Sequence, residues 1–448
     1  MSVIEVRSGV MVESVNSVHR GLAGLFDREQ KRPLLLGLLI CLHIVICAAS
    51  LRISFPFYRS EYVMYDPAGL ANAIAATAMF CLIAPLFVFA RFSFGYLCGF
   101  YLFTMVAGFL WLNSFSKLQY DHVAAGISAG LSCLTFLLPA LLITSRIGRP
   151  IEISERSFER ILYVIVAFCL ATSIAAATYG FRVVAINDIY QYRAELQFPT
   201  ALNYAIASTM TVLIPFAYAC FALRRRYLMA AAMLAIAISF YPSTFTKIAL
   251  FTPAWLLCMT LLSIFLGRIA AILSLFLPVL AGVLLIITIG EPMRRYFGIV
   301  NARMLSVPSV AMDVYNEYFA QHELTHFCQI WLLKPFMSCA LKQQISVEMN
   351  STYPLGFLNA SLFATEGIAS VGLWAAPLVT FACGLVIGFG NRLSAGLSER
   401  FILISAAIMP QVITNVPFST LMLTHGLWLL FLLWYLTPRT LFGGPAEH

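Results

Sequence analysis

The sequence predicts an all-α integral membrane protein with about twelve transmembrane helices (range about 11–13) and one large helical loop. Hydrophobic residues make up 61% of the chain and charged residues only 11%, whereas a soluble domain carries about 25% charged residues. Runs of about 20 apolar residues, long enough to cross a bilayer, recur along the chain. One polar stretch, 290–366, interrupts them.

The predicted spans form two groups around this stretch. Residues 1–33 are polar enough to stay in the cytoplasm, and their apolar positions fit either an interfacial helix or a solvated tail. We expect a bundle of about nine spans over 34–289, the loop over 290–366, about three more spans over 367–436 and a cytoplasmic tail over 437–448. The spans are predicted at 34–51, 70–90, 94–113, 123–144, 161–180, 201–222, 227–242, 246–266, 269–289, 367–390, 401–419 and 421–436.

Lysine and arginine indicate the orientation, because cytoplasmic connections are enriched in them. With both termini in the cytoplasm, the basic connection 145–160 and the Arg224-Arg225-Arg226 triplet also lie inside. The large loop then faces outward, into the periplasm in a bacterium. The net charge of +8 fits cytoplasmic cations beside anionic lipid. No nucleic-acid partner is expected, since no basic cluster exceeds the arginine triplet.

The loop combines charged and aromatic residues, which suits a substrate with phosphate and sugar parts. Val310 to Gln321 and Phe327 to Lys342 have helical spacing, so we expect a small helical lid. Cys328 and Cys339 are the only cysteines of the loop, and outside the cytoplasm they could form a disulfide. The chain has no CxxC pair, so a structural zinc site of that type is not indicated.

Cations on the predicted outer side are the first candidate site. Arginine offers a planar fork of donors that matches phosphate oxygens, and lysine adds a point charge. A cation at the membrane edge is costly unless it is paired, so such residues are functional candidates. Snorkelling, or pairing with Glu195, Asp188 or Asp313, is the structural alternative. The candidates are Arg182, Arg193, Lys247, Arg294, Arg295 and Arg303.

Polar residues in and near the late spans are the second candidate group. They could line a cavity, although interhelical hydrogen bonding is the commoner role of Asn and Gln in such spans. Glu366 lies near the outer boundary, where it could face the site or water. The group consists of Asn359, Glu366, Gln411, Asn415 and His425.

The third candidate is an HExxH motif, His322-Glu323-Leu324-Thr325-His326. On a helix the two histidines would share one face and could bind zinc, with Glu323 as general base. A catalytic zinc needs a third protein ligand, and no downstream motif supplies one; Glu348 is a candidate by type only. The alternatives are a general base, a sugar contact or an amphipathic helix, and we expect no metal cofactor.

With these features the chain resembles the Wzy-type polymerases of bacterial surface polysaccharides, within the O-antigen polymerase–ligase superfamily. The resemblance runs from about Arg182 to Leu436. Its landmarks are Arg193, Lys247, Arg303 with Pro308, Asp313 to Phe319, Asn350 to Tyr353, Asn359 and Glu366-Gly367. The Arg-x10-Gly motif of some members is absent, because the positions eleven after Arg193 and Arg303 are Tyr204 and Val314.

The resemblance implies a metal-independent, inverting glycosyltransferase at the periplasmic face of the inner membrane. It would join oligosaccharide repeat units of O-antigen or a similar polysaccharide, with donor and acceptor both linked to undecaprenyl diphosphate. A chain-length regulator protein is an implied partner. The diphosphate would bind Arg193, Lys247 and Arg303, supported by Arg182, Arg294 and Arg295. The base candidates are His322, Glu323, Asp313 and Glu366, and the sugar contacts Tyr318, Tyr315, Trp331 and Asn359.

Three other functions compete with this one. An O-antigen ligase would transfer the same donor to a lipid A core, and the superfamily's ligases use a loop histidine that His322 or His326 could match. A membrane zinc metalloprotease would use His322, Glu323 and His326. A transporter or flippase would spread polar residues over many spans and two related halves, whereas here they concentrate outside and late in the chain.

Overall fold

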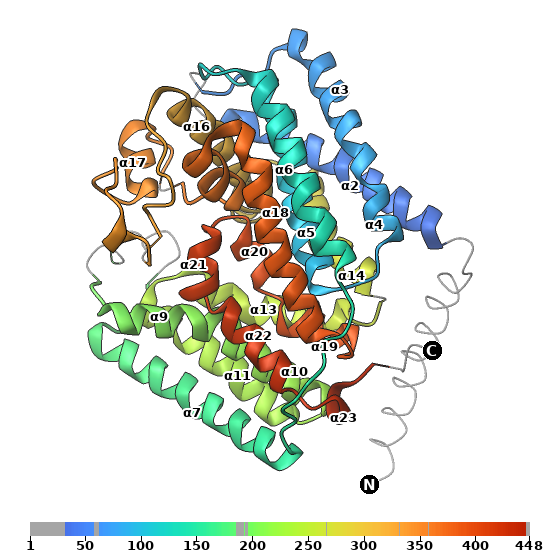
Figure 1. Cartoon of the computed structure of the whole chain (residues 1–448), viewed down its shortest axis with the longest axis vertical. Coiled ribbons are helices and arrows are strands. Elements are labelled where there is room, and N and C mark those ends of the chain that lie inside the picture. Colours follow the sequence, from blue (N-terminus) through green and yellow to red (C-terminus); the bar gives the residue numbers. More distant parts are fainter. Residues whose placement is uncertain are drawn as a thin grey trace.

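The computed structural model describes residues 32–57, 62–184, 192, 196–265, 267–330, 332–356 and 358–444. Across these residues the chain forms helices and turns, without a β-strand. Figure 1 shows the helices packed as one bundle, with α16 (Val307–Gln321) and α17 (Ile345–Thr352) at its upper left end. We call this the loop end, because α16 and α17 of the large loop lie there. The short α23 (Arg439–Phe442) lies towards the opposite end.

Nine helices in the described part of the chain are long and apolar enough to cross a membrane. This is the composition of a multi-pass helical membrane protein. They are α2 (Arg32–Ser54), the stretch Pro67–Phe89 that includes α3 (Leu70–Phe80) and α4 (Pro85–Phe89), α5 (Phe94–Asn113), α6 (His122–Leu142), α7 (Glu155–Tyr179), α9 with η5 and α10 (Thr200–Leu223), α11 with α12 (Tyr227–Thr244), α14 (Gly267–Thr288) and η9 with α18 (Phe363–Ser394). Two shorter apolar helices are α13 (Lys247–Leu262) and α22 (Leu427–Leu436).

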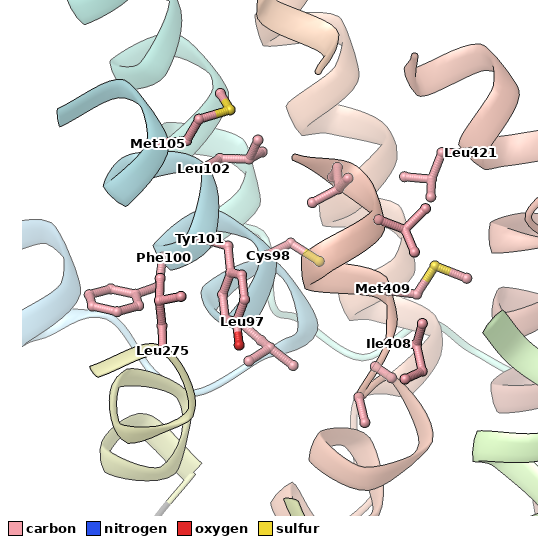
Figure 2. Packing of buried hydrophobic residues seen from close by; sticks show 14 of the residues in the cluster. Leu97, Cys98, Phe100, Tyr101, Leu102, Met105, Leu275, Ile408, Met409 and Leu421 are labelled. Carbon is pink, nitrogen blue, oxygen red and sulfur yellow. The ribbon is translucent and has the colours of Figure 1, made fainter. Parts of the chain in front are cut away.

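Helix α5 forms the centre of the bundle, because nearly all of its residues are buried. Figure 2 shows its residues Leu97 to Met105 between Leu275 of α14 and Met409 of the C-terminal region. Glycine allows neighbouring helices to approach closely. A Cβ at Gly95 would lie 2.0 Å from the Ala140 oxygen, and one at Gly384 would lie 2.4 Å from the Phe136 oxygen. Helix α6 is thereby held directly against α5 and α18.

A continuous helical stretch follows α14 and forms the first part of the loop. It consists of α15 (Arg294–Phe297), the π-helical η7 (Gly298–Ser306) and α16. Asn301 donates to the Val279 carbonyl of α14 and to Ser50 of α2, and Ser306 donates to Ser54. The predicted helix from Val310 to Gln321 is confirmed as part of α16, which packs against the bundle.

The predicted helix from Phe327 to Lys342 is wrong. This stretch consists of turns around the short η8 (Lys334–Phe336) among its described residues. His326 and Phe327 have φ values of 46° and 66°, in a region that cannot continue a right-handed helix. The disulfide between Cys328 and Cys339 is confirmed, with Cα atoms 5.3 Å apart. The stretch is therefore a loop closed covalently at its base.

The predicted continuous span over 401–419 is also wrong. The chain breaks there into α19 (Glu399–Ser405), α20 (Met409–Ile413) and α21 (Phe418–Leu423), and the span predicted over 421–436 begins as a regular helix only at Leu427. Pro410 and Pro417 explain two of the interruptions, because proline lacks an N–H and disfavours helical backbone before it. The Trp255 indole donates to the freed Ala407 carbonyl at 2.9 Å.

Helix α18 has a sharp reversal near its start. Gly372 has φ 76° and ψ 174°, a conformation open almost only to glycine. Residues 363–371 fold back along α18 as a result, so that a Cβ at Gly367 would lie 3.2 Å from the Ala376 Cβ. Backbone carbonyls at the reversal are bonded from other segments: Thr325 N–H donates to Ala369 and the Ser128 hydroxyl to Leu373.

Candidate functional site

The reversal at Gly372 places a short helix and an extended segment inside the bundle. The rings of Phe363 and Phe136 lie 6.0 Å apart. Helix α6 begins at His122, and with a rise of about 1.5 Å per residue Phe136 lies about 20 Å along the helix from that end. The chain before Phe363 is non-helical, and Leu358, Ala360 and Ser361 are buried. Non-helical backbone at such depth occurs where protein or a cavity surrounds it. We call residues 358–371 the re-entrant segment.

Glu366 joins the re-entrant segment to the broken C-terminal region. Its side chain is only 6% exposed. Oε1 accepts from the Ser419 N–H at 2.9 Å and from the Ser419 hydroxyl at 3.0 Å. Oε2 accepts from the Phe418 N–H at 3.0 Å and from the Thr365 hydroxyl at 2.5 Å. The carboxylate therefore binds the first two amides of α21.

This geometry bears directly on the role of Glu366. A carboxylate has about four acceptor positions on its two oxygens, and four donors already use them. A general base needs a lone pair within reach of the proton that it removes. The arrangement favours a structural role, in which Glu366 of the re-entrant segment holds the start of α21 in place.

Asp313 is a second buried carboxyl, on α16. It is 0% exposed. Ser116 donates to Oδ2 at 2.9 Å, and the Tyr120 hydroxyl donates to Oδ1. One turn further, Glu317 accepts from the Gln119 N–H at 2.8 Å. These contacts connect α16 to the chain between α5 and α6.

The Asp313 side chain has two hydroxyl donors and no cation among its described hydrogen-bond and ion-pair partners. Burial, together with nearby Glu317, raises the pKa of the Asp313 carboxyl to about 7, although Tyr120 and Ser116 donate to it. Burial and the negative charge of Asp313 raise the pKa of the Tyr120 hydroxyl. A proton on Asp313 near neutral pH is thus compatible with its surroundings.

His322 stands at the C-terminal end of α16 with its ring exposed. Its Nδ1 lies 2.8 Å from the Tyr318 carbonyl, and its ring stacks on the Tyr318 ring with centroids 4.0 Å apart. A carbonyl can only accept, so Nδ1 carries a proton and Nε2 of the neutral ring keeps a lone pair. The contacts fix the ring of an exposed histidine at the loop end and leave Nε2 of the neutral ring as its proton acceptor.

Tyr318 and Glu348 extend this arrangement towards α17. The Tyr318 hydroxyl donates to Glu348 Oε1 at 3.3 Å, and Gln343 donates to Oε2 at 3.1 Å. Burial and the Glu348 charge raise the pKa of Tyr318 to about 12. Glu348, which the sequence marked only as a zinc candidate by type, instead fixes the tyrosine on which His322 stacks.

The expected helical setting of the HExxH motif is wrong. Helix α16 ends at Gln321, and His322 already has extended backbone, with φ −122° and ψ 160°. His326 follows in a turn with positive φ, so the two histidines do not occupy one helical face. Within the described residues, His, Cys, Asp and Glu side chains form no group of three that could hold a metal ion. Glu323 is exposed between the two histidines.

The predicted cations occupy two places. Arg182 N–H donates to the Pro242 carbonyl, and its guanidinium lies 5.4 Å from the Tyr192 ring centroid. Tyr192 in turn faces Phe245, two residues before Lys247 at the start of α13. The segments that carry Arg182 and Lys247 therefore lie next to each other. Arg193 lies outside the described residues.

The other cations lie on α15 and η7. Arg294 bonds Glu291 at 3.3 Å, and Arg295 and Arg303 are exposed. The described contacts do not bring these three together with Arg182 and Lys247. Convergence of all six cations on one diphosphate stays a prediction.

The predicted sugar contacts differ in accessibility. Tyr315 is buried and donates to the Leu358 carbonyl at 3.3 Å, so its ring supports the re-entrant segment and leaves no open face. Tyr318 is buried under His322. Asn359 is exposed, although its neighbours Leu358 and Ala360 are buried, so its amide is available to a ligand. Trp331 lies outside the described residues.

Three residues that hold α16 in place were not predicted from the sequence. Ser116, Gln119 and Tyr120 lie in the short connection between α5 and α6. A run of polar residues between two apolar spans is a weak signal, because most such runs are only solvated turns. The partner carboxyls are about two hundred positions away in the chain, so only the fold brings them together.

No family model, curated protein or solved structure matches this chain.

Proposed function

We propose that the chain is a membrane-embedded glycosyltransferase that polymerises lipid-linked oligosaccharide repeat units, as the resemblance implies. The observation that carries the proposal is the setting of His322. Its Nδ1 is held by the Tyr318 carbonyl, and its ring is exposed at the loop end of a membrane bundle. A general base for a sugar hydroxyl needs this combination of fixed tautomer and access.

The chemistry would be a single inverting displacement. An acceptor hydroxyl oxygen attacks the anomeric carbon of the donor, a new glycosidic bond forms, and the bond from that carbon to the lipid diphosphate breaks. The hydroxyl proton moves to His322 Nε2, and the bonding electrons leave with the diphosphate. Preorganised cations would stabilise the charge that develops on the leaving group. Arg303 and Arg295, exposed on the helical stretch that leads to His322, are candidates for this role.

The two substrates would be a growing glycan and a single repeat unit, both on undecaprenyl diphosphate. Holding both in one bilayer would supply much of the acceleration through proximity. The proposal includes an inner-membrane location with both termini in the cytoplasm and the loop end in the periplasm. A chain-length regulator would be the partner protein. The proposed reaction needs no metal cofactor.

The test is elongation of purified lipid-linked repeat units by the reconstituted protein in excess EDTA, read as a ladder on a gel. We expect a ladder from the parent protein and from His326→Ala, and none from His322→Ala. The pair is matched, since both histidines are exposed and belong to one motif. Equal ladders from both variants would remove His322 as the base. Without a ladder from the parent, transfer to a lipid A core would identify a ligase.

A further inference from the structure

The loop closed by Cys328 and Cys339 carries an exposed apolar surface. Leu332 is 63% exposed, Phe336 84% and Met337 38%. Side chains of this size are rarely gathered on a surface that faces only water, and such clusters mark contact sites. We call these three residues the apolar tip.

The chain segment that contains the apolar tip carries charge of one sign. Residues 324–347 contain Lys334 and Lys342 and no Asp or Glu, and both lysines are exposed. A surface that mixes Leu and Phe with Lys and has no acidic residues suits the boundary between acyl chains and anionic headgroups. It suits a second copy of itself less well, because the lysines would repel one another.

The base of this loop is fixed to the bundle. Thr325 N–H donates to the Ala369 carbonyl at 2.8 Å, and the hydroxyls of Thr325 and Ser370 lie 3.1 Å apart. These contacts join the loop to the chain just before the reversal at Gly372. The disulfide joins two cysteines eleven positions apart in sequence, so the tip stays near the loop end.

From these observations we infer that the apolar tip inserts into the interfacial layer of the host bilayer, on the side of the loop end, and that Lys334 binds anionic headgroups there. The occupant is the bulk lipid surface. This inference does not depend on the proposed glycosyl transfer. It gives the loop a second attachment besides its contact with α18.

The test uses a photo-crosslinking amino acid at position 336 of the full chain, reconstituted in vesicles without a lipid-linked glycan. Vesicles of phosphatidylcholine and of phosphatidylcholine with phosphatidylglycerol are compared. We expect several-fold more lipid adducts from position 336 than from position 344, where Gln344 is polar and exposed outside the disulfide loop. Adding phosphatidylglycerol should increase the yield at position 336.

A charge reversal tests the headgroup contact separately. Lys334→Glu should lower the lipid adducts at position 336 in the anionic vesicles and leave the yield in pure phosphatidylcholine unchanged. Lys334 is exposed, and a folding defect would lower the adduct yield in both kinds of vesicle. A decrease in the anionic vesicles alone therefore reports the headgroup contact. Adducts mainly to a second copy of the chain would overturn the inference and show that the apolar tip is a contact between copies. Equal lipid yields from positions 336 and 344 would overturn the inference.

Discussion

The bundle around α5 and α6 and the C-terminal region from Phe363 to Leu436 use similar apolar residues in different ways. Helices α5 and α6 each run without a break in the helix, although α6 contains Pro139. The C-terminal region reverses at Gly372 and breaks around residues 406–408, 414–417 and 424–426. Other segments bond groups freed there: Trp255 at Ala407, Thr211 at His425 and Glu366 at the start of α21.

The difference shows that hydropathy alone does not determine whether an apolar run becomes one helix. In an apolar environment an unpaired backbone group costs several kcal/mol, so each break requires a polar partner from elsewhere. A continuous helix bonds most of its backbone groups within itself and depends less on such partners. Their removal should therefore destabilise the broken region and leave the regular one intact.

The largest effect is expected from Glu366→Gln. A glutamine amide has one oxygen, so it cannot accept from both backbone amides and both hydroxyls. The Thr365 hydroxyl can still donate to the Ser361 carbonyl, but at least one other buried donor loses a charged acceptor, and hydrogen bonds to charged groups are worth about 1.5–3 kcal/mol each. The free energy of unfolding should therefore fall by at least about 1.5–3 kcal/mol. Thermal melting of the purified protein in detergent measures this, with the exposed substitution Glu323→Gln as control. Equal melting of both variants would mean that Glu366 does not connect the segments.

Asp313→Asn changes a buried carboxyl that lies on a regular helix, away from the breaks. Its pKa of about 7 in the folded chain lies above the ordinary 3.8. Between about pH 4 and 7 the folded chain therefore binds more protons than the unfolded chain, and its stability falls as pH rises. Each pKa unit corresponds to about 1.4 kcal/mol.

The asparagine side chain is neutral at every pH, so the variant does not lose stability in this way as pH rises. Asp313→Asn should therefore melt at a higher temperature than the parent at pH 8 and close to the parent at pH 4. Melting curves at several pH values test the sign directly. A parent protein that becomes more stable from pH 4 to pH 7, relative to the variant, would contradict the raised pKa.

The sequence predicted the regular region well and the broken region poorly. Apolar runs predicted about twelve spans, nine long apolar helices are present in the described residues, and helical spacing predicted the part of α16 from Val310 to Gln321. The disulfide was predicted only as a possibility for an extracytoplasmic loop. The breaks do not, because Glu366, Ser128 and Trp255 act on residues distant in the chain. Among the site residues, the orientation of His322 by Tyr318 is a local relation, four positions apart. The helical HExxH motif was predicted from local spacing alone, and it is wrong because α16 ends before His322.

The smallest effect is expected where α18 packs against α6 of the regular region, from Gly384→Ala. A Cβ at this position would lie 2.4 Å from the Phe136 oxygen and 2.7 Å from Pro139. The obstacle is backbone, so α6 and α18 would have to separate, and such overpacking costs about 1–3 kcal/mol. The matched control is Gly130→Ala on α6, whose nearest contact would be a Phe80 ring atom at 4.0 Å. Melting should fall for the first variant and stay at or above the parent value for the second. If Gly384→Ala destabilised the chain more than Glu366→Gln, close helix contact would matter more to the fold than the polar junction, and the contrast between the two regions would be reversed.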